Sequence, residues 1–282
     1  MQKDIKHIIR EEFVKCAQDP VHFMKKYCYI QHPQRGKINF NLFPFKEKVL
    51  TLFQENPYSI VLKSRQLGLS TLSAGYALWL MVFHENKNVL ALATTQATAR
   101  NLVAKVQFMF EGLPSWLKVS SLENNKLSLR LKNGSKIQAK SSNSDAARSE
   151  AVSLLIIDEA AFIDNIKETW ESAESGLDNS NDFLPIKLPW YVHPERDEEW
   201  RKRQDTLLGD PRLAAQECDC DFSTSGDVVF YNEFVEFYKQ TYVMEPLEKR
   251  GADRNLWIWE PADYSRAYVI VADVARGDGH TM

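Results

Sequence analysis

One loop, KSRQLGLST at residues 63–71, contains residue types that bind phosphate. The usual phosphate-binding loop has the pattern G-x-x-x-x-G-K-[ST]. Aligning its second glycine with Gly68 places Lys63 at the first glycine, Leu69 at the lysine and Ser70 at the magnesium-binding hydroxyl. The loop therefore departs from the usual pattern at the position of its cation.

Backbone chemistry allows this loop to bind an anion without that lysine. The N–H groups of the loop and of the helix that follows attract anions whatever the side chains are. Lys63 and Arg65 add positive charge, and Arg65 is placed to stabilise a transferred phosphoryl group. A plain strand-to-helix turn capped by Ser64 or Ser70 explains the same residues equally well. The nucleotide-binding residues predicted by the first interpretation are Lys63, Ser64, Gln66, Gly68, Ser70 and Thr71.

A pair of carboxylates, Asp158 and Glu159, follows the apolar run at residues 152–157. Placing two like charges side by side at the end of a buried strand is costly without a cation. Asp158 is therefore predicted to hold Mg²⁺ together with Ser70, and Glu159 to orient and polarise the attacking water. The alternative, an aspartate that caps the next helix, is less favoured because the phosphate loop lies upstream in the right order.

Three further polar residues have weaker signals. Arg148 lies in a serine-rich loop before the acidic strand, from which it could reach a phosphate in its own or a neighbouring subunit, or simply be a surface arginine. Asp273 ends an apolar strand and resembles the first metal ligand of an RNase H-like nuclease, but two-metal hydrolysis needs more carboxylates than the chain contains after it. Arg196 stands among alternating charges that are typical of a solvated helix face.

Predicted strands and helices alternate along the chain around these residues. Apolar runs at residues 58–62, 88–93 and 152–157 predict strands, and helical spacing at residues 71–83 and 96–110 predicts helices. This order predicts a mainly parallel central sheet with helices on both faces, an α/β fold that binds ligands beyond the carboxyl ends of its strands. Other predicted elements are helices at residues 4–18, 44–53, 162–175, 194–208 and 211–219 (the last two opened by proline), hairpins at residues 28–41 and 126–140, a loop or linker around residues 257–261 and a strand at residues 267–272.

Composition describes an ordinary globular chain. Of 282 residues, 44% are hydrophobic and 26% charged, and no apolar run approaches the length of a membrane span, so a cytoplasmic protein is expected. Cys218 and Cys220 have no second pair at zinc-ligand spacing, so free thiols are favoured. Because the net charge is −3, any binding to nucleic acid must come from a local basic patch or from several subunits together.

The loop SRQLGLS and the sequence IIDE at residues 156–159 together resemble the large terminase subunits of tailed phages, in the T-even-like branch. The resemblance runs from about Phe43 to the last residue. It implies a P-loop ATPase that uses ATP and Mg²⁺ to move double-stranded DNA into a procapsid, followed by a nuclease domain. It also implies a homo-oligomeric ring that docks on a portal protein with a small terminase subunit, in the host cytoplasm and without a membrane. Arg65, Arg148, the acidic pair and Asp273 match the family's loop arginine, trans-acting arginine, Walker B pair and first nuclease ligand.

The resemblance divides the chain into an N-terminal extension at residues 1–42, an ATPase core at 43–192, a connecting subdomain at 193–262 and the start of an incomplete nuclease domain at 263–282. Three departures stand out. Lys46 replaces an adenine-reading glutamine, Leu69 replaces the phosphate lysine, and residues 162–182 show no strand with the Ser/Thr coupling motif. The favoured function is a packaging ATPase without nuclease activity of its own. A DNA-stimulated helicase-like ATPase and a non-catalytic remnant that binds portal or DNA remain alternatives.

Overall fold

The structure is a computed structural model that describes residues 2–141, 152–163, 166, 183–221, 240–241, 244–250 and 256–259. The chain divides into two compact units, Met1–Phe222 and Ser223–Met282. The described elements of the second unit are the antiparallel strands β10 (Glu248–Arg250) and β11 (Leu256–Ile258). The predicted loop or linker at residues 257–261 is therefore wrong at its start, because Trp257 pairs with Lys249 inside this ladder.

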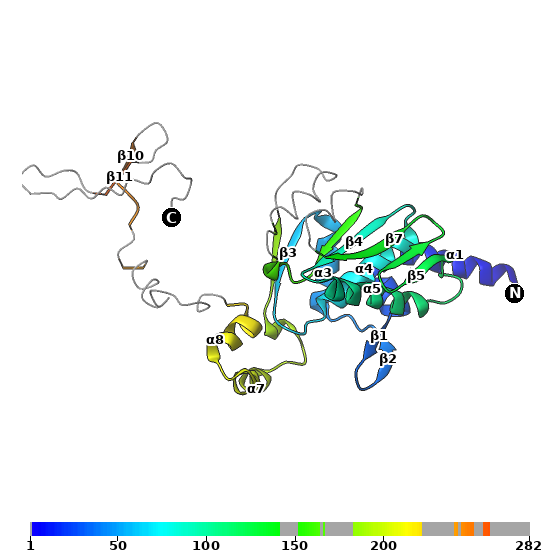
Figure 1. The fold of residues 1–282 in the computed structure, drawn as a ribbon, viewed down its shortest axis with the longest axis horizontal. Coiled ribbons are helices and arrows are strands. Elements are labelled where there is room, and N and C mark those ends of the chain that lie inside the picture. Colours follow the sequence, from blue (N-terminus) through cyan, green and yellow to red (C-terminus); the bar gives the residue numbers. More distant parts are fainter. Residues whose placement is uncertain are drawn as a thin grey trace, which may run out of the picture. The chain divides into compact units, whose positions relative to one another are not determined.

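The first unit alternates strands and helices (Figure 1). Its elements are α1 (Gln2–Gln18), α2 (Pro20–Tyr27), β1 (Tyr29–His32), β2 (Gly36–Asn39), α3 (Pro44–Glu55), β3 (Ser59–Lys63), α4 (Leu69–Phe83), β4 (Asn88–Ala93), α5 (Gln96–Glu111), β5 (Ser121–Asn125), β6 (Ser128–Leu131), β7 (Lys136–Ser141), β8 (Leu154–Ile157), η1 (Ala160–Phe162), β9 (Leu184–Leu188), η2 (Trp190–Val192), α7 (Glu198–Leu208), α8 (Pro211–Ala214) and η3 (Ala215–Asp219). The α/β class predicted from the alternation is confirmed.

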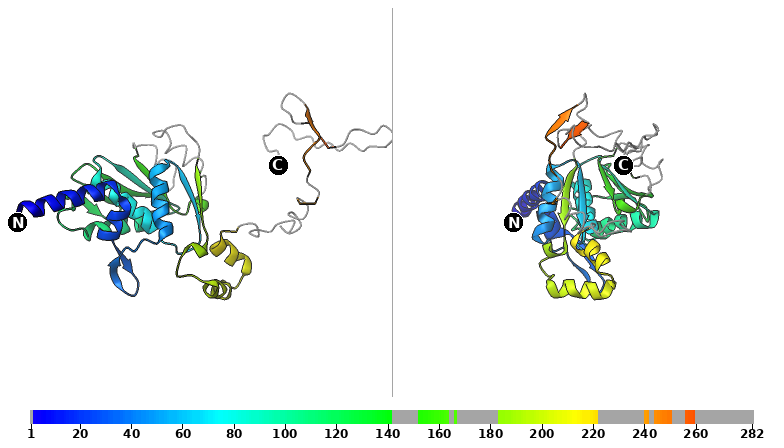
Figure 2. Two further views of the ribbon diagram at one scale, coloured as in Figure 1. Left: turned by 180° about the vertical axis from the view of Figure 1, so that it is seen from behind. Right: turned by 90° about the vertical axis from the view of Figure 1, so that its left-hand side faces the viewer.

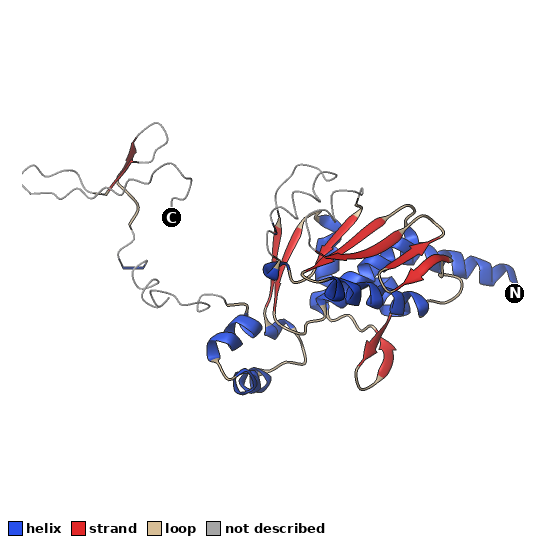
Figure 3. Cartoon of the chain, in the orientation of Figure 1, coloured by secondary structure: helices blue, strands red, loops and turns tan. Residues whose placement is uncertain are grey.

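The strands form several sheets (Figure 3). Five strands pair in the order β5-β6-β7-β4-β8, in which β4 is parallel to both β7 and β8. The strand before the phosphate loop, β3, pairs in parallel with β9 in a separate two-stranded sheet. A single central sheet was predicted. Within the described ranges, the strand before the phosphate loop and the strand before the acidic pair instead lie in two different sheets. Ile60 and Leu62 of β3 stay exposed, at 58% and 39%.

The core lies between the five-stranded sheet and helices α4 and α5, which Figure 1 shows packed along it. Helix α4 buries residues around most of its circumference, as expected for a helix with apolar neighbours on several sides. Trp79 of α4 donates its indole N–H to the Cys16 carbonyl oxygen, at 2.8 Å, in the buried interior. This bond anchors α1 to the core, while the N-terminal part of α1 projects from the unit in Figure 2.

Several predicted boundaries change in the structure. The helix predicted from residue 194 begins at Glu198, because Asp197 rather than a proline caps it by accepting the Trp200 N–H. Helix α4 begins two residues earlier than predicted, directly after Gly68. Strands β5 and β9 were not predicted. The helix predicted at residues 162–175 does not begin where expected, because Phe162 ends η1 and Ile163 is extended. Nearly all of its other residues, and the strand predicted at residues 267–272, lie outside the described residues.

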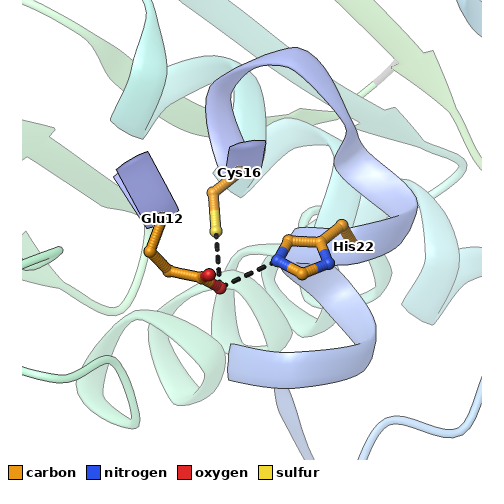
Figure 4. A group of neighbouring side chains, drawn as sticks. All are labelled: Glu12, Cys16 and His22. Atoms are coloured by element: carbon orange, nitrogen blue, oxygen red, sulfur yellow. Dashed lines mark hydrogen bonds and ion pairs between the residues drawn. The ribbon is translucent and has the colours of Figure 1, made fainter. Parts of the chain in front are cut away.

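A hydrogen-bonded cluster centred on Glu12 joins α1 to α2 (Figure 4). One carboxylate oxygen of Glu12, Oε1, lies 2.8 Å from His22 Nε2, 2.7 Å from Lys26 Nζ and 2.9 Å from the Tyr27 hydroxyl. Cys16 Sγ approaches the same oxygen at 4.0 Å. The ligand atoms of Glu12, Cys16 and His22 lie within 4.8 Å of one another, as in a metal site. The Lys26 ammonium already supplies the positive charge there, so the cluster is a structural link.

The Glu12 cluster makes stability depend on pH. The Lys26 and His22 hydrogen bonds lower the pKa of Glu12 from 4.5 to about 2. Because the folded pKa is the lower one, the contribution is present above about pH 4.5 and is lost as pH falls toward 2. We expect urea unfolding to show that Glu12→Gln destabilises the chain at pH ~7 and does so less at pH ~3. An equal loss at both pH values would contradict this, and Glu11→Gln, which removes an exposed pair with His7, should change little.

Candidate nucleotide-binding site

The phosphate loop connects the end of β3 to the start of α4. Ser64 N–H donates to the Leu188 carbonyl at 2.8 Å, and Arg65 N–H donates to the Glu217 carbonyl at 2.9 Å. Gln66 and Gly68 both have positive φ, at 58° and 76°. Glycine adopts this conformation easily, whereas for Gln66 it is strained and must be held by its surroundings. The loop is thus fixed by the strand and the segment that follow it much later in sequence.

The backbone N–H groups at the end of this loop make no hydrogen bond to another described residue. No protein acceptor lies within hydrogen-bonding distance of the N–H groups from Gln66 to Thr71 in the part of the chain that the structure describes. Gly68 occupies the N-cap position of α4, so neither Ser64 nor Ser70 is the capping residue. Free N–H groups at the positive end of a 15-residue helix form an anion-binding site.

Arg196 holds the other side of the loop, and its role was missed in the sequence. Its guanidinium donates to Ser64 Oγ at 3.3 Å, to the Arg65 carbonyl at 3.0 Å and to the Gln66 carbonyl at 3.2 Å. It also stacks over Trp200, 4.1 Å from the ring centroid. Burial lowers the pKa of this guanidinium, which stays positive in any physiological range. Arg196 therefore binds two carbonyl oxygens of the loop, whereas the loop N–H groups from Gln66 to Thr71 have no acceptor among the described residues.

A second contact supports the loop from the segment after α7. The Glu217 carbonyl that accepts from Arg65 lies in the π-helical turn η3. Arg201 ties this turn to α7, because its Nη2 lies 2.7 Å from Asp219 Oδ2 and it also pairs with Asp205. The segment predicted as a connecting subdomain thus contributes directly to the geometry of the phosphate loop.

The acidic pair ends β8 as predicted. Asp158 N–H donates to the Leu92 carbonyl at 2.9 Å and extends the ladder between β8 and β4. The Asp158 side chain is half-buried and accepts the Glu159 N–H at 3.1 Å. Glu159 has φ 57° and ψ 38°, a left-handed conformation that is strained for a glutamate, and its side chain is exposed. Such a strained residue beside a carboxylate is a common feature of functional sites.

The structure brings some predicted residues together and leaves others apart. Lys63, Ser64, Arg65, Gln66, Gly68, Ser70 and Thr71 share the loop and the first turn of α4. Asp158 and Glu159 lie on the other sheet, and no hydrogen bond or ion pair between described residues joins them to the loop. Arg148 and Asp273 lie outside the described residues. That the loop and the acidic pair share one pocket remains a prediction.

A family model for the N-terminal part of the T4likevirus-type terminase large subunit matches residues 60–183, which include the loop and the acidic pair. Residues 60–183 of this chain are thus similar to a terminase large-subunit domain. Among the described helices, none combines the length and apolar character of a membrane span.

Solved terminase structures resemble this chain at low identity. The large terminase ATPase domain of Thermus phage P74-26 is 20% identical over 58% of this chain and 88% of that one, with a TM-score of 0.44. The bacteriophage HK97 large terminase is 18% identical over 68% and 41%, with a TM-score of 0.45. A large terminase from a thermophilic bacteriophage, solved in complex with ADP, is 12% identical over 59% and 50%, with a TM-score of 0.47.

Proposed function

We propose that this chain includes the ATPase domain of a terminase large subunit, which hydrolyses ATP with Mg²⁺ and couples the reaction to the movement of double-stranded DNA into a procapsid. The observation that carries the proposal is the run of free N–H groups at the start of α4, held in place by Arg196. Such a run, at a strand-to-helix loop, suits the phosphates of a nucleotide. The terminase family model, which spans both this loop and the acidic pair, supports the packaging role.

Each predicted residue has a part in this proposal. The loop N–H groups, Lys63, Ser64, Gln66, Gly68 and Thr71 bind the phosphates, and Arg65 stabilises charge on the γ-phosphate. Mg²⁺ would be held by Ser70 and Asp158, whose hydroxyl and carboxylate oxygens are ligands that it prefers, and would neutralise phosphate charge. Glu159 accepts a proton from the attacking water. Arg148 acts on a phosphate of its own or a neighbouring subunit.

The wider assembly follows from the family and is likewise proposed. A ring of copies would act on double-stranded DNA together with a portal protein and a small terminase subunit in the host cytoplasm. Asp273 would begin a nuclease site that needs further carboxylates to work.

Removing the metal tests the ATPase proposal. We expect the purified chain to release phosphate from ATP in the presence of Mg²⁺ and to stop when excess EDTA is added, because the developing charge then loses its counter-ion. Phosphate release at the buffer rate with Mg²⁺ present would contradict the proposal. Binding of a labelled ATP analogue without turnover would favour a non-catalytic role, and unwinding of a tailed duplex would favour a helicase.

A further inference from the structure

A buried lysine, Lys46, lies in the first turn of α3 with only 7% of its surface exposed. Lysines are seldom buried unless they are paired with an acid. Among the described residues the Lys46 ammonium has no hydrogen-bond acceptor and no carboxylate within ion-pair distance. Glu195 raises its pKa from farther away, but burial outweighs this and lowers the pKa overall. Lys46 is therefore a mostly buried cation that has no hydrogen-bond or ion-pair partner among the described residues.

Three phenylalanine rings hold this ammonium in place. Lys46 Nζ lies 5.4 Å from the ring centroid of Phe40, 5.1 Å from that of Phe43 and 5.7 Å from that of Phe45. Cation–π contacts attract an ammonium without using its N–H groups as a carboxylate would. The cage thus fixes the position of the charge and leaves its donors for another ligand.

The ammonium is placed against the phosphate loop. A Cβ atom built on Gly68 would lie 3.4 Å from Lys46 Nζ and 3.8 Å from Lys46 Cε. Gly68 caps α4, whose N-terminus carries a partial positive charge of about half an elementary charge. Two positive groups without an acceptor repel each other at this spacing. One anion between them would satisfy both.

We propose that Lys46 binds the phosphate groups of the nucleotide in place of the lysine that the loop lacks. The proposal rests on the nucleotide-binding function proposed above. Leu69 stands at the loop's lysine position and is 6% exposed, so it packs in the core and contributes no charge. The cation comes instead from α3, an element that precedes the loop in sequence. The competing role, donation to an acceptor atom of the base, is separated from this one by the ligands used in the test.

The experiment measures binding of tripolyphosphate, ATP and GTP to the full chain and to Lys46→Met by titration calorimetry. Loss of a charge-assisted hydrogen bond is expected to raise the dissociation constant of all three ligands by roughly 10- to 100-fold. In the absence of ligand, Lys46→Met should melt at a higher temperature than the wild type, because it removes a desolvated, unpaired charge. Lys48→Met, which changes an exposed lysine on the same helix, is the matched control and should leave binding unchanged.

Three results would overturn the proposal: a wild-type chain that does not bind tripolyphosphate, a Lys46→Met variant that binds it as tightly as the wild type, or a change confined to the preference between ATP and GTP. Lys46→Arg, which keeps the charge, should retain most of the binding and serves if the methionine variant does not fold. Phosphate binding that depends on Lys46 without Mg²⁺-dependent turnover would defeat the ATPase proposal alone. Normal turnover and binding in Lys46→Met would defeat this inference alone.

Discussion

Replacing Glu159 with glutamine is expected to lower the turnover number for ATP by at least ~100-fold, the usual contribution of a positioned general base. The amide keeps the size of the side chain but cannot accept a proton from the attacking water. The affinity for ATP should remain nearly unchanged, because the loop N–H groups and not Glu159 would contact the phosphates. Steady-state phosphate release and calorimetric titration with ATP measure the two quantities separately.

A matched control for Glu159 is available in Glu85→Gln, which changes an exposed glutamate in the turn after α4 and should leave both quantities at wild-type values. Equal turnover by the wild type and Glu159→Gln would contradict the role of Glu159 as the base. A large loss of ATP affinity with an unchanged turnover number would instead assign Glu159 to binding.

Replacing Arg196 with alanine is expected to damage the phosphate loop from a distance. The change removes three hydrogen bonds to Ser64, Arg65 and Gln66 and leaves the strained Gln66 conformation without a brace. We expect the free energy of unfolding to fall by about 1–3 kcal/mol. A loop displaced by about 1 Å is expected to lower kcat/KM for ATP by on the order of 10- to 100-fold.

Two further variants distinguish this bracing role from a general effect of charge. Arg196→Lys keeps the charge but cannot donate to three oxygens in the same planar arrangement, so it should recover only part of the activity. Arg203→Ala removes an exposed arginine from α7 and should have little effect on either quantity. If Arg203→Ala and Arg196→Ala lowered kcat/KM equally, or if neither did, the bracing role would be wrong.

Local sequence patterns predicted the elements that position the site. The boundaries of β4, Asn88–Ala93, follow from a continuous apolar run, and α5 follows from apolar residues at helical spacing. The position of the phosphate loop, directly between β3 and α4, follows from its glycine and from the patterns on either side of it. These signals are short in range, so one sequence is enough to detect them.

Contacts between distant segments could not be predicted in this way. Arg196 bonds to Ser64 across 132 residues, and its acidic neighbours in sequence gave it the pattern of a solvated helix face. The sequence suggested only that Lys46 alters recognition of the base. No local sequence pattern indicates that its ammonium lies close to Gly68. Strand β9 is short and contains Pro185, which weakens its strand pattern although it pairs fully with β3.

The division of the strands between two sheets has a consequence for coupling. In the described residues β3 pairs only with β9, and β8 pairs only with β4. The Ser/Thr coupling motif expected from the resemblance was not found at residues 162–182, most of which lie outside the described ranges, and the next described strand after the acidic pair is β9. The proposed coupling of ATP hydrolysis to DNA movement therefore requires the loop on β3 and the acidic pair on β8 to meet at one nucleotide.

A crystal structure of this chain with Mg²⁺ and a non-hydrolysable ATP analogue tests that arrangement most directly. We predict one Mg²⁺ about 2.1 Å from Ser70 Oγ, with Asp158 bound to it directly or through water, and Glu159 facing the γ-phosphate. The analogue bound at the loop with Asp158 and Glu159 out of reach of the ion and the phosphates would contradict the account.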